Sequence, residues 1–218
     1  MILQKGVYFI TGIDTDAGKS IATGELARQI AETGMSVITQ KFIQTGCRDM
    51  SEDIAVHRRI MGIDLQQCDL DHITAPVIFP FPASPHLSAK LEKTRVDTEL
   101  IEESTRKLAA KYDIVLIEGA GGLMVPIDGL YTTADYVVDN DLPLVLVTSA
   151  KLGSINHTLL TLEVCRNRKI SLAALVFNHW PQSDPVITED TLDYFHKYID
   201  YFHPGVPITE IPLMDPQS

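Results

Sequence analysis

Largely apolar runs alternate with longer amphipathic stretches along most of the chain. Five of these runs have the length and composition of buried strands: Val7–Thr11, Ser36–Lys41, Asp113–Ile117, Leu144–Thr148 and Leu172–Phe177. A last short strand is expected near Pro207–Leu213. Most of these segments lack the strict polar–apolar alternation of a half-exposed strand, so we expect them to be covered on both faces.

The segments between the strands favour helices. The evidence for each helix is apolar residues at roughly helical spacing or a capping residue at its start. The predicted helices are Ser20–Glu32, Glu52–Met61, Asp97–Lys111, Ser154–Asn167 and Glu189–Tyr201. A passage containing Pro76, Pro80, Pro82 and Pro85 is expected to be loop or extended chain. The pattern predicts an α/β fold with a mainly parallel sheet and helices on both faces. Ligands of such sheets bind at the carboxyl ends of the strands.

Length and composition limit the class of protein. The 218 residues are enough for a single domain with a sizeable core, covering residues 1–218, but are few for two domains. The chain has 18 Lys and Arg against 29 Asp and Glu, a formal charge of −11, so nucleic acid is not an expected partner.

Three further sequence features bear on the location of the protein. The start, MILQKGVYFITG, is too short an apolar run for a signal peptide, and no stretch is apolar enough to span a membrane. The cysteines Cys47, Cys68 and Cys165 are scattered, which is typical of reduced thiols. We therefore expect a cytoplasmic protein with no membrane partner.

A phosphate-binding loop is the strongest candidate for chemistry. The first strand leads into Gly12–Ser20 (GIDTDAGKS), which ends in Gly-Lys-Ser before a helix. Backbone N–H groups at a helix N-terminus attract phosphate, Lys19 would reach the outer phosphates, and the Ser20 hydroxyl would bind magnesium. Five residues separate Gly12 from Gly18, one more than in the general motif. A chance Gly-Lys-Ser at a helix start is the alternative, and the strand–loop–helix context makes it the weaker one.

Charged residues at neighbouring strand ends add to this site. Lys41 ends the second strand, where it could neutralise a phosphoryl group in transfer. Glu118 follows the strand DIVLI and precedes a glycine-rich turn, a position suited to holding magnesium. Asp53 looks like part of an ordinary helix start capped by Ser51, and the sequence pattern alone indicates a structural role for it.

Taken together, these segments resemble those of the dethiobiotin synthetases, a family within the P-loop NTPase superfamily. The loop Gly12–Ser20 is similar to that family's G-T-D-T-E-V-G-K-T loop. Four more segments follow in the same order: Lys41 with Thr45-Gly46, Ser84-Pro85-His86, Glu118–Gly122 (EGAGG) and Lys151–His157 (KLGSINH). The resemblance runs from residue 7 to about residue 178.

The resemblance implies an ATP-dependent ring closure. Carbon dioxide adds to one amine of 7,8-diaminononanoate, ATP phosphorylates the resulting carbamate, and the second amine expels phosphate to give dethiobiotin. It implies Lys19 and Lys41 as catalytic residues, magnesium as cofactor and a homodimer. The metal would be surrounded by Ser20, Asp53 and Glu118.

The resemblance also implies the binding residues. The ATP site would comprise Asp16, Ala17, Gly18, Lys19, Ser20, Ile21, Asp53, Glu118, Gly119, Ala120, Gly121 and Asn178, the last of which would contact the base. The substrate site would comprise Thr15, Thr45, Gly153, Ser154, Ile155 and Asn156, with the start of the helix at Gly153–Asn156 taking the substrate carboxylate. From the residues alone, Ser154 is equally well a simple helix cap.

The chain departs from the family pattern at several positions. Asp16 stands where glutamate is usual, and Phe42 replaces the proline that usually follows the lysine. A nucleotide-switch ATPase of the partitioning or septum-positioning type is the main alternative, but such proteins carry an additional lysine early in the loop, where this chain has Asp14 and Asp16. A cobyrinate-type amidoligase would need a glutamine-hydrolysing domain, for which the chain has no room.

Overall fold

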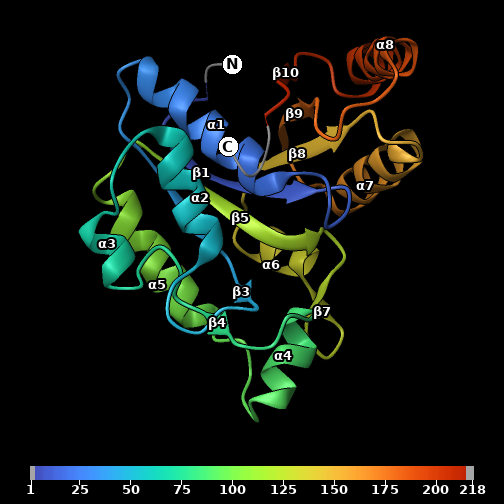
Figure 1. The fold of residues 1–218 in the computed structure, drawn as a ribbon. Helices are drawn as coiled ribbons and strands as arrows, with labels where there is room; N and C mark the ends of the chain where they lie inside the picture. The colour runs from blue at the N-terminus through green and yellow to red at the C-terminus, as the bar shows by residue number, and fades with distance from the viewer. Residues whose placement is uncertain (1–2, 215–218) are drawn as a thin grey trace.

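The protein folds around one central sheet, seen in a computed structural model that describes residues 3–214 (Figure 1). All pairings in this sheet of six strands are parallel. From one edge to the other, the order is β10 (Ile208–Ile211), β9 (Leu172–Asn178), β8 (Leu144–Ser149), β1 (Gly6–Gly12), β5 (Ile114–Gly122) and β2 (Val37–Lys41). The predicted α/β class and parallel sheet are therefore confirmed.

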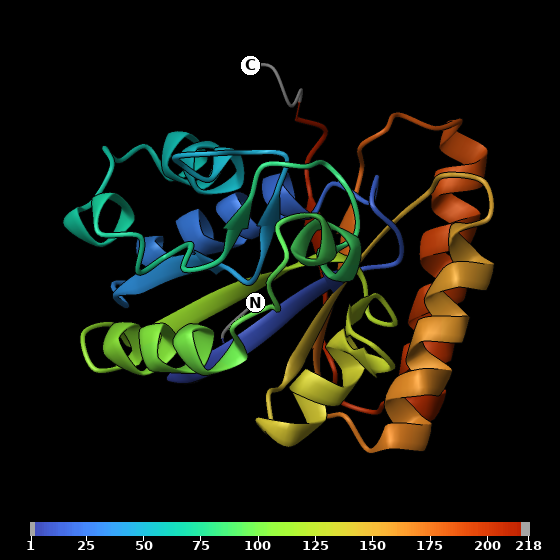
Figure 2. The same cartoon turned by 90° about the horizontal axis from the view of Figure 1, so that it is seen from below.

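Helices cover both faces of the sheet, as Figure 2 shows in a view turned by 90°. One face packs against α1 (Lys19–Glu32), which in turn contacts α2 (Glu52–Met61). The opposite face is covered by α5 (Thr98–Ala109), α6 (Thr133–Asp139), α7 (Ser154–Arg168) and α8 (Pro185–Phe202). Alternate residues of each strand supply the two cores: in β1, Ile10 faces α1 and Phe9 faces the other layer.

Short helices and strands complete the fold. The smaller helices are α3 (Gln67–Leu70) and α4 (Pro85–Leu91). Two-stranded sheets are formed by β3 (Gln44–Thr45) with β4 (Ile78–Phe79), and by β6 (Pro126–Asp128) with β7 (Tyr131–Thr132). No helix in the described range 3–214 is long and apolar enough to cross a membrane.

Strand register already brings distant functional residues together. Lys41 is the direct partner of Glu118 between β2 and β5, and Glu118 pairs with Ile10 of β1. Because all three strands run in the same direction, their carboxyl ends lie at one rim of the sheet. The phosphate loop leaves β1 at that rim.

Two sequence expectations require correction. Pro85 does not lie in loop or extended chain: it is the first residue of α4, where its missing N–H and fixed φ are compatible with a helix start. The last helix begins at Pro185 rather than near Glu189, after Asp184, whose side chain accepts a hydrogen bond from Val186 N–H. The expected free thiols are confirmed for Cys47, Cys68 and Cys165.

Candidate active site

A cavity of about 720 Å³ opens at the carboxyl rim of the sheet, between the phosphate loop and the ends of β2 and β5. It collects residues from segments that lie far apart in the sequence. Twelve of the predicted site residues line it: Thr15, Asp16, Gly18, Lys19, Ser20, Ile21, Lys41, Thr45, Asp53, Glu118, Ala120 and Gly121.

The phosphate loop curls around its own lysine. The Lys19 ammonium donates hydrogen bonds to the backbone carbonyls of Asp14, at 2.9 Å, and Thr15, at 3.3 Å. Gly18 is the N-cap of α1 with a φ of +73°, a left-handed conformation that glycine adopts without strain. It supplies no side-chain cap, so the first turn of α1 meets the cavity with its positive dipole end.

Asn178, at the end of β9, closes the loop from behind. Its side-chain amide donates to the carbonyls of Ala17, at 3.2 Å, and Gly18, at 3.4 Å. A Cβ atom on Gly18 would lie only 2.2 Å from Asn178 Nδ2, so the two residues are in close contact. Asn178 is fully buried and does not line the cavity. Its expected contact with a nucleotide base stays a prediction.

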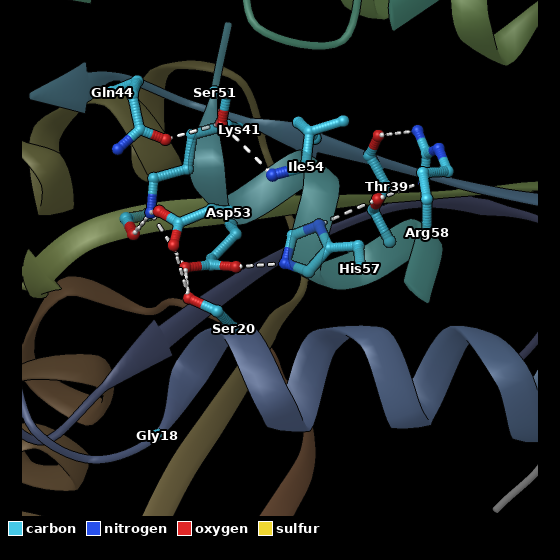
Figure 3. Close-up of polar contacts among 12 residues, drawn as sticks. Gly18, Ser20, Thr39, Lys41, Gln44, Ser51, Asp53, Ile54, His57 and Arg58 are labelled. Atoms are coloured by element: carbon cyan, nitrogen blue, oxygen red, sulfur yellow. Dashed lines mark hydrogen bonds and ion pairs between the residues drawn. The ribbon is translucent and has the colours of Figure 1, made fainter. Parts of the chain in front are cut away.

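Two acids, a hydroxyl and an ammonium group meet at the floor of the cavity (Figure 3). Ser20 Oγ lies 2.8 Å from an Asp53 carboxylate oxygen and 2.9 Å from Glu118 Oε1. The Lys41 ammonium forms ion pairs with both acids, at 2.5 Å to Asp53 and 2.8 Å to Glu118. Lys41 also donates to the carbonyl of Gly119, at 3.3 Å.

Electrostatics keep the pair of Lys41 and Glu118 ionised although both are buried. Burial alone would raise the pKa of Glu118, but the charge of Lys41 and the contact with His57 hold it well below its ordinary value. Burial would likewise lower the pKa of Lys41, and the attraction of Glu118 and Asp53 outweighs this, so its pKa is raised. Lys19 lacks such close partners, and burial lowers its pKa despite an opposing contribution from Glu118.

The oxygen atoms at this floor fit a magnesium ion. Ser20, Asp53 and Glu118 would hold it, and their hard oxygens are the ligands that magnesium prefers. Residues 3–214 contain no group of three or more His, Cys, Asp or Glu side chains arranged for a metal. An ion held by one hydroxyl and two carboxylates therefore needs phosphate oxygens and water as its remaining ligands, which is the usual situation for magnesium beside a nucleotide.

A second cavity of about 430 Å³ adjoins the first and shares Thr15, Thr45, Ala120 and Gly121 with it. Its remaining wall comes from Pro82–Pro85 and Val125. Thr15 and Thr45 thus stand at the boundary between the two cavities. This position agrees with a ligand that extends away from the phosphate loop.

The predicted residues Gly153–Asn156 lie elsewhere. They form the N-cap and first turn of α7 and line neither cavity. The cap itself is Gly153, with a φ of +94°, and no side chain caps the helix. Ser154 is therefore not the cap, and its buried hydroxyl instead lies 3.3 Å from Ser149 Oγ. Ala17 and Gly119 also contribute no lining: Ala17 packs in the core and Gly119 offers its carbonyl to Lys41.

Three residues at the site were missed by the sequence analysis as functional candidates. Trp180 and Lys151 line the larger cavity, and His57 lies behind Glu118 with 2.6 Å between its Nε2 and a Glu118 oxygen. The position of Lys151 inside a recognised segment was an available signal. His57 gave no such sequence signal, because a histidine in the middle of a helix is usually an ordinary core residue.

Comparison with known proteins places this chain in a family. A family model described as an AAA domain matches residues 6–210. A protein of Haemophilus influenzae named ATP-dependent dethiobiotin synthetase BioD 2 is 55% identical over 84% of this chain and 96% of its own length. One of the same name from Pasteurella multocida is 50% identical over 91% of this chain and 93% of its own.

A solved structure adds evidence for the fold alone. A ParA family ATPase from Chlorobium tepidum aligns with a TM-score of 0.53 at 17% identity, over 98% of this chain and 86% of its own. The P-loop type of α/β fold is thereby confirmed. The high sequence identities to the two dethiobiotin synthetases point to one family with this fold. The chain belongs to the ATP-dependent dethiobiotin synthetase family and is an ATP-dependent enzyme.

Proposed function

We propose that the protein converts 7,8-diaminononanoate, carbon dioxide and ATP to dethiobiotin, ADP and phosphate in biotin biosynthesis. One observation carries this proposal: Lys19, Lys41 and the metal-binding oxygens proposed for Ser20, Asp53 and Glu118 lie together at the carboxyl rim of the sheet. A second cavity of about 430 Å³ lies beside them. A phosphoryl group held at that rim would have room for an acceptor in the second cavity. The names of the relatives support this acceptor being the diamine.

The chemistry requires a carbamate to be activated. A carbamate oxygen is a poor leaving group, so its phosphorylation to a mixed anhydride is needed before the second amine can attack the carbon and release phosphate. Carbamate and triphosphate are both anionic, and they repel each other unless cations lie between them. The chain supplies two lysines for this purpose at the start of α1 and the end of β2.

Each lysine has a distinct proposed role. Lys19 would bridge the outer phosphates and the carbamate, because it rises from the loop that holds the phosphates. Lys41 would stabilise the phosphoryl group in transfer, and the two acids keep its ammonium charged and oriented in the cavity. Magnesium, held by Ser20, Asp53 and Glu118, would supply further neutralisation of phosphate charge.

The remaining substrate contacts follow from the two cavities. Thr15 and Thr45 would contact the diamine or its carbamate at the boundary between the cavities. Gly153–Asn156 lie outside both, so their proposed contact with the substrate carboxylate requires the tail to come from the site of a partner subunit. A homodimer working in the cytoplasm is part of the same proposal, as is the contact of Asn178 with the base.

A coupled ADP-release assay tests the proposal. ADP release is expected to depend on both the diamine and bicarbonate, and comparison of ATP with GTP and CTP would establish the nucleotide preference. The variants Lys19→Ala and Lys41→Ala should each lose about 10²–10³-fold in kcat, because each removes a cation from the transition state. The exposed Lys107→Ala on α5 is the matched control and should retain full activity.

Two results would contradict the proposal. Normal turnover in either site variant would refute the role of that lysine. ATP hydrolysis that ignores the diamine would instead favour the alternative, a nucleotide-switch ATPase.

A further inference from the structure

A chain of buried polar side chains runs from α3 to Glu118 behind the active site. It consists of Asp69, Arg58, Thr39, His57 and Glu118, all of them buried and none contributing to the wall of the main cavity except Glu118. Figure 3 shows Arg58 and His57 reaching Thr39 from α2. Burying so many polar groups is costly unless each finds a partner, so the connections between them are informative.

The far end of this chain is firmly anchored. Arg58 forms a two-pronged ion pair with Asp69, with Nε at 2.9 Å and Nη2 at 2.8 Å from its two oxygens. Asp69 also accepts from the Thr74 hydroxyl at 2.6 Å and from the Gln66 N–H at 2.8 Å. A planar guanidinium held by both oxygens of a carboxylate has little freedom to reorient.

The chemistry of the two ends fixes the direction of two hydrogen bonds in this chain. A guanidinium can only donate, so Thr39 Oγ1, at 2.8 Å from Arg58 Nη1, accepts. The Thr39 hydroxyl proton is then available to His57 Nδ1, 2.9 Å away. A carboxylate can only accept, so His57 carries a proton on Nε2, and this N–H donates to Glu118 Oε2 at 2.6 Å.

As a consequence, the two carboxylate oxygens of Glu118 have different partners. Oε2 is bound by His57, whereas Oε1 faces Ser20, at 2.9 Å, and Lys41, at 2.8 Å. Rotation of the carboxylate would break the bond to His57. The helix carrying His57 packs closely on α1: a Cβ on Gly24 would lie 3.2 Å from the His57 Cα.

We propose that His57, oriented by Thr39 and Arg58, is a positioning residue that fixes the Glu118 carboxylate with one oxygen presented to the nucleotide–metal site. The proposal rests on the role proposed above for Glu118 but not on the identity of the second substrate. Groups that orient a metal-binding side chain in this way typically affect metal affinity about 10–100-fold.

Binding of Mn²⁺ to the protein in the presence of ADP, followed by electron paramagnetic resonance, measures this role without turnover. His57→Leu should weaken Mn²⁺ binding at least about tenfold, and Glu118→Gln provides the reference for loss of the ligand itself. His57→Gln should recover most of the affinity, because its amide N–H can occupy the place of the imidazole Nε2–H. The Mg²⁺ concentration for half-maximal activity should follow the same order.

A matched pair of variants covers the case in which His57→Leu fails to fold. Thr39→Val removes the hydroxyl that orients His57, whereas Thr23→Val removes an equally buried hydroxyl that has no hydrogen-bond partner among residues 3–214. Thr39→Val should bind Mn²⁺ more weakly than both Thr23→Val and the unmodified protein.

Equal Mn²⁺ affinity in Thr39→Val and Thr23→Val, or a His57→Leu protein within twofold of the unmodified one, would overturn the proposal. A lowered melting temperature with unchanged Mn²⁺ affinity would assign the chain a purely structural role and count against it equally. Because the experiment uses ADP and Mn²⁺ alone, it also separates this inference from the ring-closing reaction: absence of diamine turnover would leave its result intact.

Discussion

The residue after Lys41 shows how a local departure from the family pattern is accommodated. Phe42 is almost fully buried, with its ring 5.3 Å from that of Phe9 and 4.5 Å from that of Tyr136, measured between centroids. Its N–H donates to the Glu118 carbonyl at 2.8 Å, a bond that proline could not make. The aromatic cluster and this bond together fix the end of β2, from which Lys41 reaches the acids.

Replacing this ring should cost stability. Phe42→Ala is expected to lower the free energy of unfolding by about 3–5 kcal/mol, because it removes a large buried side chain and leaves a cavity. Phe42→Leu should lose less, since it retains much of the volume. Urea denaturation measures both. A loss below about 1 kcal/mol in the alanine variant would show that the surroundings collapse to fill the space.

Among the elements, α6 depends on a reciprocal cap at its first turn. The Thr132 N–H and hydroxyl both donate to the Asp135 carboxylate, at 2.7 and 2.6 Å, and the Asp135 N–H lies 3.4 Å from Thr132 Oγ1. Asp135 also pairs with Arg168 at the end of α7. The hydrogen bonds from Thr132, with a further contribution from Arg168, lower the pKa of Asp135 from 3.8 to about 2.

This lowered pKa predicts a pH-dependent stability. A carboxyl whose pKa is lower in the folded protein stabilises the fold above its unfolded pKa, and the contribution disappears as the pH falls toward about 2. Asp135→Asn should therefore lower the melting temperature by a few degrees at pH 7, in line with the loss of a cap, and by progressively less between pH 4 and pH 2. Asp128→Asn, at a more exposed carboxylate, is the control. A difference that stays constant down to pH 2 would contradict this origin.

The long elements could be predicted from the sequence because their signals are local. Apolar runs marked five strands of the central sheet, and Gly12–Ser20 marked the phosphate loop, so the meeting of Lys41 and Glu118 followed from the rule that parallel strands share a rim. The seven-residue α6 and the short α4 gave too little periodicity to be recognised. The hydrogen bond between His57 and Glu118 joins positions 61 residues apart, so a local sequence pattern could not predict this contact.

At the scale of the whole molecule, the site draws its parts from both sides of β1. The cavity is lined by residues of β2, α2 and β5 on one side, and by Lys151 and Trp180, which follow β8 and β9, on the other. A nucleotide bound there would contact segments on both sides of β1. Its binding should therefore stabilise the entire fold rather than one loop.

Thermal unfolding tests this expectation. Magnesium and ADP at about 100 times the dissociation constant should add about 2.7 kcal/mol of stability, which corresponds to a rise of roughly 5–10 °C in melting temperature for a chain of this size. Trp180 is the single tryptophan of the sequence and lines the cavity, so its fluorescence should change in the same titration. Lys19→Ala should weaken both responses. An unchanged melting temperature at millimolar ADP would speak against this cavity as the nucleotide site.

The close contact between Gly18 and Asn178 has a consequence for variation in this protein. Even a methyl group at position 18 would collide with the side-chain amide of Asn178. Asn178 lies on β9, which is separated by β8 from β1, the strand that leads into the phosphate loop. The tip of the phosphate loop and the end of β9 are thus interlocked. A larger residue at position 18 therefore needs a smaller one at position 178 to make room for it.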